Sequence, residues 1–197
     1  QFQAQMAGAG VDEDLRLVES LQYGPLFVLE AIWKALDLPK VLAELLGERH
    51  FSIDIERHLF ALVASRAVSP RSKLGLERWV GEQVHIDGLP QVSVHNLYRT
   101  MDLLVEHEEA IQKAIFFSCA SLLNLAVDLI FFDTTSTYFE TEEADEEGLR
   151  RYGHSKDSRP DLPQIVIGLA VTREGLPIRC WVMKGNTHDA SCVEQIQ

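Results

Sequence analysis

Cysteine is scarce in this chain. The three cysteines among 197 residues are Cys119, Cys180 and Cys192. Their number is odd, they are scattered, and they do not follow the paired spacing of a zinc site, which argues against both a disulfide framework and a cysteine metal centre. We interpret them as core thiols of a protein that works in a reducing cytoplasm. Phosphate-cradling glycine loops and serine-nucleophile elbows are also missing.

Long hydrophobic runs are missing as well. A helix that spans a membrane needs about 20 consecutive apolar residues, and no run approaches that length, so we expect no membrane partner. The first ten residues have neither a basic segment nor an apolar core, so we expect no secretory signal peptide. Because residue 1 is Gln and not Met, we expect the chain to begin inside a larger reading frame, with a disordered start over residues 1–10.

Positive charge is in short supply. There are 18 basic and 30 acidic residues, and the net charge is −12. A nucleic-acid-binding protein usually presents a basic face, so this balance is unusual for that class. It does not exclude the class, because a local basic patch is sufficient for contact with phosphates. The apolar fraction of 46% and the charged fraction of 24% are those of an ordinary globular protein.

The chain divides into two halves of different pattern. Residues 11–126 carry apolar side chains at helical spacing, for example Ile55, Leu59, Leu62 and Val63. Breaks at Gly24-Pro25, Pro39, Gly47, Ser69-Pro70 and 88–90 divide this half into five to seven short helices. Ser93 is the expected N-cap of the helix through Leu104.

From residue 127 onward the pattern predicts strands. Residues 164–172 form an apolar strand of central type, residues 173–175 a tight turn, and residues 176–184 the return strand. Pro160 and Pro163 exclude regular structure just before this hairpin. The predicted fold class is therefore α+β: an all-helical region followed by three strands of a sheet that is incomplete.

The most informative segment is residues 128–139. Residues 129–132 are predicted to be a strand buried on both faces, and Thr134, Thr135 and Thr137 extend the strand propensity. Asp133 then lies in or at the end of a central strand, where a charge is costly unless it is compensated. A divalent cation would compensate it and carry chemistry. In the alternative interpretation, Asp133 ends the strand and accepts hydrogen bonds from Thr134 or Thr135.

Other charged residues near this segment have competing interpretations. Asp128 is interpreted as a boundary residue, and the acidic run 142–147 as a solvated loop. The basic residues Arg150, Arg151, Lys156 and Arg159 either contact a phosphate backbone or pair with the neighbouring acidic run. His154, His188 and Asp189 lack metal-ligand spacing, so surface roles are expected for them.

Several motifs together resemble a known family. Residues 128–140 resemble the first catalytic strand of insertion-sequence transposases of the DDE type, which have an RNase H-like core and an Asp-Asp-Glu triad. The loop 152–164, the strands 165–173 and 175–184, and the turn 185–189 agree with that family in order and spacing. Upstream, residues 94–104 resemble the helical region that precedes its catalytic core.

The resemblance implies a DNA transposase that cuts and joins strands by Mg²⁺- or Mn²⁺-dependent phosphoryl transfer, with water attacking first and a DNA 3′-hydroxyl second. Asp133 matches the first triad position and would be a metal ligand. In the family the second Asp lies on a fourth strand and the Glu on a later helix, so both are expected beyond Gln197. Asp161 and Asp189 do not occupy those elements. Residues 127–197 would be a partial catalytic domain.

The resemblance also implies a setting. The helical region, residues 11–126, would bind element ends or a second protomer of a homo-oligomer, in the nucleoid-associated cytoplasm of a bacterium or archaeon. Two alternatives stay open. One is a catalytically inactive, DNA-binding remnant of a transposase, and the other is a different RNase H-like nuclease that uses the same carboxylate without strand transfer.

Overall fold

The computed structural model describes residues 20–47, 53–123, 130–141, 143–188 and 191. The expectations for residues 1–10, Asp128, Asp189 and Cys192 lie outside these ranges. The helices are α2 (Gly24–Ala35), α3 (Leu38–Leu46), α4 (Ile55–Val68), α5 (Lys73–Glu82), α6 (Val94–Glu106) and α7 (Glu108–Leu123), and the strands are β1 (Ile130–Tyr138), β2 (Gln164–Thr172) and β3 (Pro177–Lys184). Helices precede strands, which confirms the α+β class.

The chain forms two compact units. The helical unit holds α4, α5, nearly all of α2 and most of α6, within residues 1–34 and 48–103. The sheet unit holds α3, α7 and the strands, within residues 35–47 and 104–197. Two helices from the helical half of the sequence thus belong to the unit that contains the sheet. Within the described ranges, no helix has the length and apolarity needed to cross a membrane.

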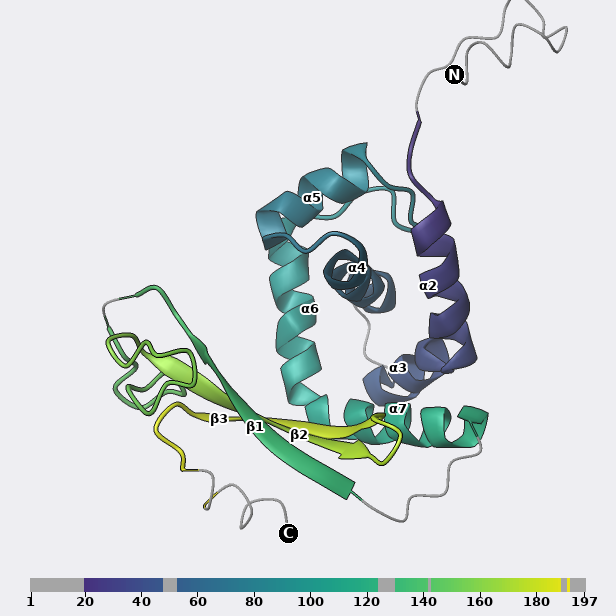
Figure 1. The fold of residues 1–197 in the computed structure, drawn as a ribbon. Helices are drawn as coiled ribbons and strands as arrows, with labels where there is room; N and C mark the ends of the chain where they lie inside the picture. Colours follow the sequence, from purple (N-terminus) through teal and green to yellow (C-terminus); the bar gives the residue numbers. More distant parts are fainter. Residues whose placement is uncertain (1–19, 48–52, 124–129, 142, 189–190, 192–197) are drawn as a thin grey trace, which may run out of the picture. The chain divides into compact units, whose positions relative to one another are not determined.

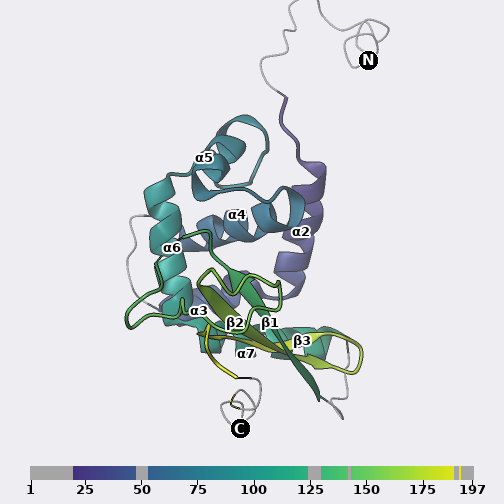
Figure 2. The same cartoon turned by 60° about the vertical axis from the view of Figure 1, so that its left-hand side comes forward.

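In the helical unit, α4 lies between α2 and α6, as Figure 1 and Figure 2 show. Because neighbours surround it, α4 is buried around most of its circumference, including Leu59, Phe60 and Ala61. Of the apolar residues at helical spacing, Ile55 and Leu59 are each 5% exposed, whereas Val63 is 44% exposed. The helix ends before Ser69-Pro70 as predicted.

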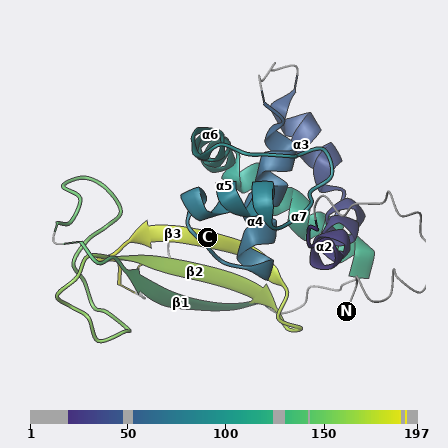
Figure 3. The same cartoon turned by 90° about the horizontal axis from the view of Figure 1, so that it is seen from above.

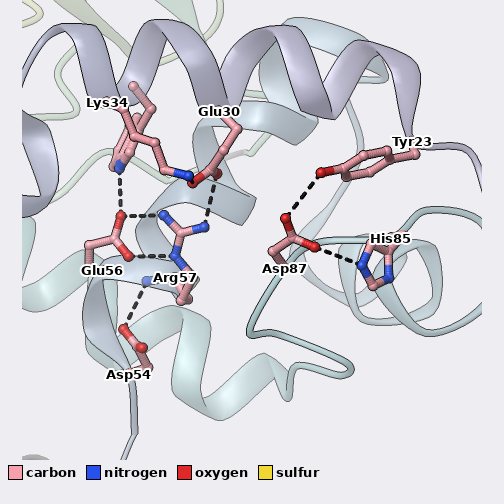
Figure 4. A network of polar contacts seen from close by, with 9 residues as sticks. Tyr23, Glu30, Lys34, Asp54, Glu56, Arg57, His85 and Asp87 are labelled. Carbon is pink, nitrogen blue, oxygen red and sulfur yellow. Dashed lines mark hydrogen bonds and ion pairs between the residues drawn. The ribbon is translucent and has the colours of Figure 1, made fainter.

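The burial of α4 also encloses charge. Arg57 is 9% exposed, and its guanidinium donates to Glu56 at 2.5 Å and to Glu30 at 2.9 Å. The indole N–H of Trp33 donates to Glu56 at 2.5 Å. Figure 4 shows the carboxylates of Glu30 and Glu56 on either side of the Arg57 guanidinium. The hydrogen bond with Glu56, followed by that with Glu30, raises the pKa of Arg57 above its ordinary value. A buried cation needs such partners, because its desolvation is otherwise uncompensated.

Helix α6 begins where the sequence predicts. Ser93 Oγ accepts the backbone N–H of Asn96 at 3.3 Å, which confirms Ser93 as the N-cap. This bond satisfies one of the amides that the first helical turn leaves without an intrahelical partner.

The sheet is antiparallel with strand order β1-β2-β3, and Figure 3 shows the three strands side by side with β2 in the middle. The predicted bounds of the second strand, residues 164–172, are confirmed. Gly175, in the turn before β3, has φ +83°, a backbone conformation that favours glycine. Gln112 of α7 donates to the Cys180 carbonyl at 3.1 Å and accepts the Cys180 N–H at 2.6 Å. This side chain pairs with the edge of β3 and ties α7 to the sheet.

Strand β1 is buried on one face only. Phe131 is 51% exposed, whereas Thr134 and Ser136, whose side chains lie on the opposite face, are each 7% exposed. Among the described strands β1 is at the edge of the sheet, and alternation along a strand places Asp133 on the exposed face. The prediction of a strand buried on both faces is therefore wrong. The charge of Asp133 needs no compensation for burial, so burial gives no support to a metal ligand at this position.

Candidate functional site

Asp133 is the fourth residue of β1, and its side chain is exposed. Its Oδ1 accepts the backbone N–H of Thr134 at 2.8 Å. This is the local hydrogen bond of the alternative interpretation, although Asp133 lies inside the strand and does not end it. Within the part of the chain that the structure describes, no basic side chain forms an ion pair with Asp133. The carboxylate is therefore oriented by its neighbour and accessible to a ligand.

The segment between β1 and β2 is fastened to the sheet by backbone hydrogen bonds. The N–H of Arg151 donates to the Gln164 carbonyl at 3.0 Å, and the N–H of Gln164 donates back at 2.9 Å. The N–H of Gly185 donates to the carbonyl of Leu149 at 3.0 Å. The loop thus has a defined position although it contains no regular structure, as the prolines predict.

Two glycines allow this close approach. A Cβ added to Gly185 would lie 2.0 Å from the carbonyl oxygen of Gln164, and one added to Gly153 would lie 2.1 Å from that of Gly185. Gln164 is 1% exposed, and its Nε2 donates to the carbonyls of His154 at 3.0 Å and Gly185 at 2.8 Å. Sequence reasoning did not identify these three residues as positioning elements. A glutamine at the first position of an apolar strand was the available signal.

Fastened in this way, the loop places Lys156 over β1. The backbone N–H of Lys156 donates to Ser136 Oγ at 3.0 Å. Its Nζ donates to Thr134 Oγ1 at 2.7 Å and also to the Thr134 carbonyl. An ammonium group is thereby held at the residue that follows Asp133, although 22 positions separate Lys156 from Thr134.

Two of the other basic candidates form ion pairs. Arg150 pairs with Asp145, and this hydrogen bond holds the pKa of the Asp145 carboxyl below its usual range. Arg159 donates to both oxygens of Asp161, at 2.9 and 2.7 Å, and likewise lowers the pKa of that carboxyl. Pairing with nearby acids, one of the two interpretations above, is therefore observed for both arginines, although Asp161 lies outside the acidic run.

The remaining two basic candidates bond to neutral oxygen atoms. Arg151 donates to the backbone carbonyl of Glu146, and Lys156 donates to the two oxygen atoms of Thr134. Neither bond neutralises the positive charge with a carboxylate. Of the four basic candidates, Arg151 and Lys156 therefore have the positive charges that are most available to a phosphate.

A divalent cation would find one hard ligand at this site. Over the described ranges, no group of three or more His, Cys, Asp or Glu residues is arranged to hold a metal ion. An exposed carboxylate with one oxygen anchored by an amide fits a single ligand position of Mg²⁺, which keeps several waters and takes one or two protein carboxylates.

Comparison of the chain with protein-family models, with curated proteins and with solved structures found no match. The assignment to a family therefore depends on the sequence resemblance of residues 128–189 and is a proposal.

Proposed function

We propose that this chain is part of a DDE-type insertion-sequence transposase with an RNase H-like core, a DNA-cutting and DNA-joining protein of a bacterial or archaeal cytoplasm. The observation that carries the proposal is the placement of Asp133. It lies inside the first strand of an antiparallel three-stranded sheet, exposed, with its carboxylate oriented by the Thr134 amide. The motifs in residues 128–189 supply the identity of the family.

Asp133 would be one of the protein ligands of Mg²⁺, or of Mn²⁺ in its place. When bound with the full set of carboxylates, the metal supplies activation of an attacking oxygen and stabilisation of the leaving oxygen. This chain would contribute by orienting the carboxylate that binds the metal. The hydrogen bond from the Thr134 N–H restricts the Asp133 carboxylate, and a restricted ligand loses less conformational freedom on binding.

Contact with DNA would depend on local groups, because the net charge of −12 repels a polyanion. Lys156 and Arg151 donate to neutral oxygen atoms and form no ion pair within the described chain. Arg150 and Arg159 are paired with Asp145 and Asp161, so a phosphate would have to displace a carboxylate to reach them. We therefore expect Lys156 and Arg151 to contribute more to DNA binding.

The test is Asp133→Asn in the complete gene product, with Asp157→Asn as a matched control on the exposed loop. Asparagine keeps the shape and an acceptor for the Thr134 amide but removes the charge that a divalent cation requires. We expect Mg²⁺-dependent cleavage of element-end DNA to fall at least about 100-fold with DNA binding retained. The control should cleave like wild type. Unchanged cleavage by the Asp133 variant would refute the metal-ligand role.

Two further measurements separate the proposal from its alternatives. A transposase joins the cleaved 3′ end to a target strand, whereas a nuclease of the same fold gives cleavage products alone. A DNA-binding remnant would shift element-end DNA in a salt-sensitive way without metal and give no cleavage product.

A further inference from the structure

A cavity of about 290 Å³ opens beside β1 in the sheet unit. Its lining combines three hydroxyl groups with three nitrogen-bearing side chains: Thr135, Ser136, Thr187, His154, Lys156 and His188. The volume is close to the lower end of the range for small-ligand sites, roughly 300–1,000 Å³. Lys156 and both histidines are exposed, so the cavity is accessible to a group carried on a larger molecule.

The lining is chemically selective. Apart from the apolar Val166, its described residues supply hydrogen-bond donors, Lys156 adds a positive charge, and none of them is a carboxylate. A cation would meet an ammonium group here and be repelled. A phosphate oxygen, by contrast, accepts a charge-assisted hydrogen bond from the ammonium group and further bonds from imidazole N–H and hydroxyl groups.

Lys156 is held in place before any ligand arrives. Its backbone N–H and its Nζ are bonded to Ser136 and Thr134. An ammonium group has three donor hydrogens, and two of them are used by the oxygen atoms of Thr134. The third has no partner among the described residues and is available to a ligand, and the side chain loses little further freedom when a ligand binds.

We infer that this cavity binds a phosphate group, and that the group is a phosphodiester of the DNA strand presented to Asp133. The second part rests on the proposed function. The placement supports it, because Thr135, which lines the cavity, lies two positions after Asp133 in β1, and alternation along a strand puts these two side chains on the same face. Lys156, His154 and His188 then position the strand and do not take part in bond cleavage.

The test uses NMR of the 197-residue chain with labelled histidines. The probes are inorganic phosphate and the tetranucleotide dT4, and Lys156→Gln is compared with Lys113→Gln, which makes the same charge change on α7. We expect saturable shifts of the His154 and His188 ring signals with both probes. The Lys156 variant should bind dT4 at least about tenfold more weakly, and its affinity should fall less steeply with salt, by about one unit of log–log slope. The Lys113 variant should behave like wild type.

A second variant covers the case in which Lys156→Gln undocks the loop. His154→Asn leaves the bonds of Lys156 to Thr134 and Ser136 in place and should still weaken dT4 binding severalfold. Wild-type affinity in both variants, or probe-induced shifts at His95 and His107 alone, would overturn the proposal. Binding of inorganic phosphate without dT4 would overturn the phosphodiester part only. If the 197-residue chain binds phosphate but the complete Asp133→Asn protein still cleaves DNA, the proposed function is refuted and the phosphate site stands.

Discussion

The docking of the loop over β1 depends on Gly185. In Gly185→Ala the new Cβ would lie 2.0 Å from the Gln164 carbonyl oxygen and 2.5 Å from that of Arg151. Both neighbours are backbone atoms, so no side-chain rotation relieves the overlap. The chain must shift there, and the shift strains or breaks the two hydrogen bonds between Arg151 and Gln164.

The expected cost combines two effects. Overpacking of this kind costs about 1–3 kcal/mol, and each backbone hydrogen bond contributes about 0.5–1.5 kcal/mol. The sum is about 2–6 kcal/mol. The lower bound corresponds to about a 30-fold increase in the population of the open loop.

Hydrogen exchange followed by mass spectrometry measures that population. Peptides covering residues 149–163 should exchange at least about 30-fold faster in Gly185→Ala than in wild type. Gly81→Ala is a matched control, because Gly81 lies in the last turn of α5 and nothing lies within 4 Å of its added Cβ. Unchanged exchange of residues 149–163 in Gly185→Ala would refute this account of loop docking.

Two further predictions concern the helical unit. Arg57→Ala leaves the carboxylates of Glu30 and Glu56 without their buried cation and should lower the free energy of unfolding by about 3–5 kcal/mol. Urea denaturation measures this free energy of unfolding. Arg66→Ala, an exposed substitution on the same helix, should change it by less than about 0.5 kcal/mol. The hydrogen bond from His85, followed by that from Tyr23, lowers the pKa of Asp87. The stabilisation by Asp87 is therefore present above the carboxyl's unfolded pKa and is lost as pH falls through the lower folded pKa. Asp87→Asn should lose less stability on acidification than wild type or the control Asp102→Asn. An equal loss would contradict the assignment of this pH-dependent stabilisation to Asp87.

Local signals predicted the secondary structure well where they were strong. Pro163 and the turn at residues 173–175 bound the strand Gln164–Thr172, and Ser93 caps α6. Such signals act over a few residues, through fixed backbone angles and short-range hydrogen bonds. Burial was harder to predict. Val63 and Phe131 are apolar and fit their local patterns, yet both are exposed, because burial depends on which elements pack against them.

The candidate site shows the same division. Asp133 could be selected from its position after an apolar run, and the four basic residues from their clustering. Whether each basic residue is paired with a carboxylate could not be predicted from the sequence. Nothing in the local sequence distinguishes the paired Arg150 and Arg159 from Lys156, whose ammonium is held by Thr134.

The sequence by itself determined the order of helices and strands, the hairpin of β2 and β3, and the carboxylate that is the leading candidate for chemistry. These features follow from side-chain periodicity, turn residues and capping, which act between near neighbours. Only the tertiary structure decided that Asp133 is exposed, that Gln164 and Gly185 fasten the loop, and that Lys156 reaches β1. These features depend on contacts between residues about 20 positions apart, which form when separate elements pack and which no local pattern specifies.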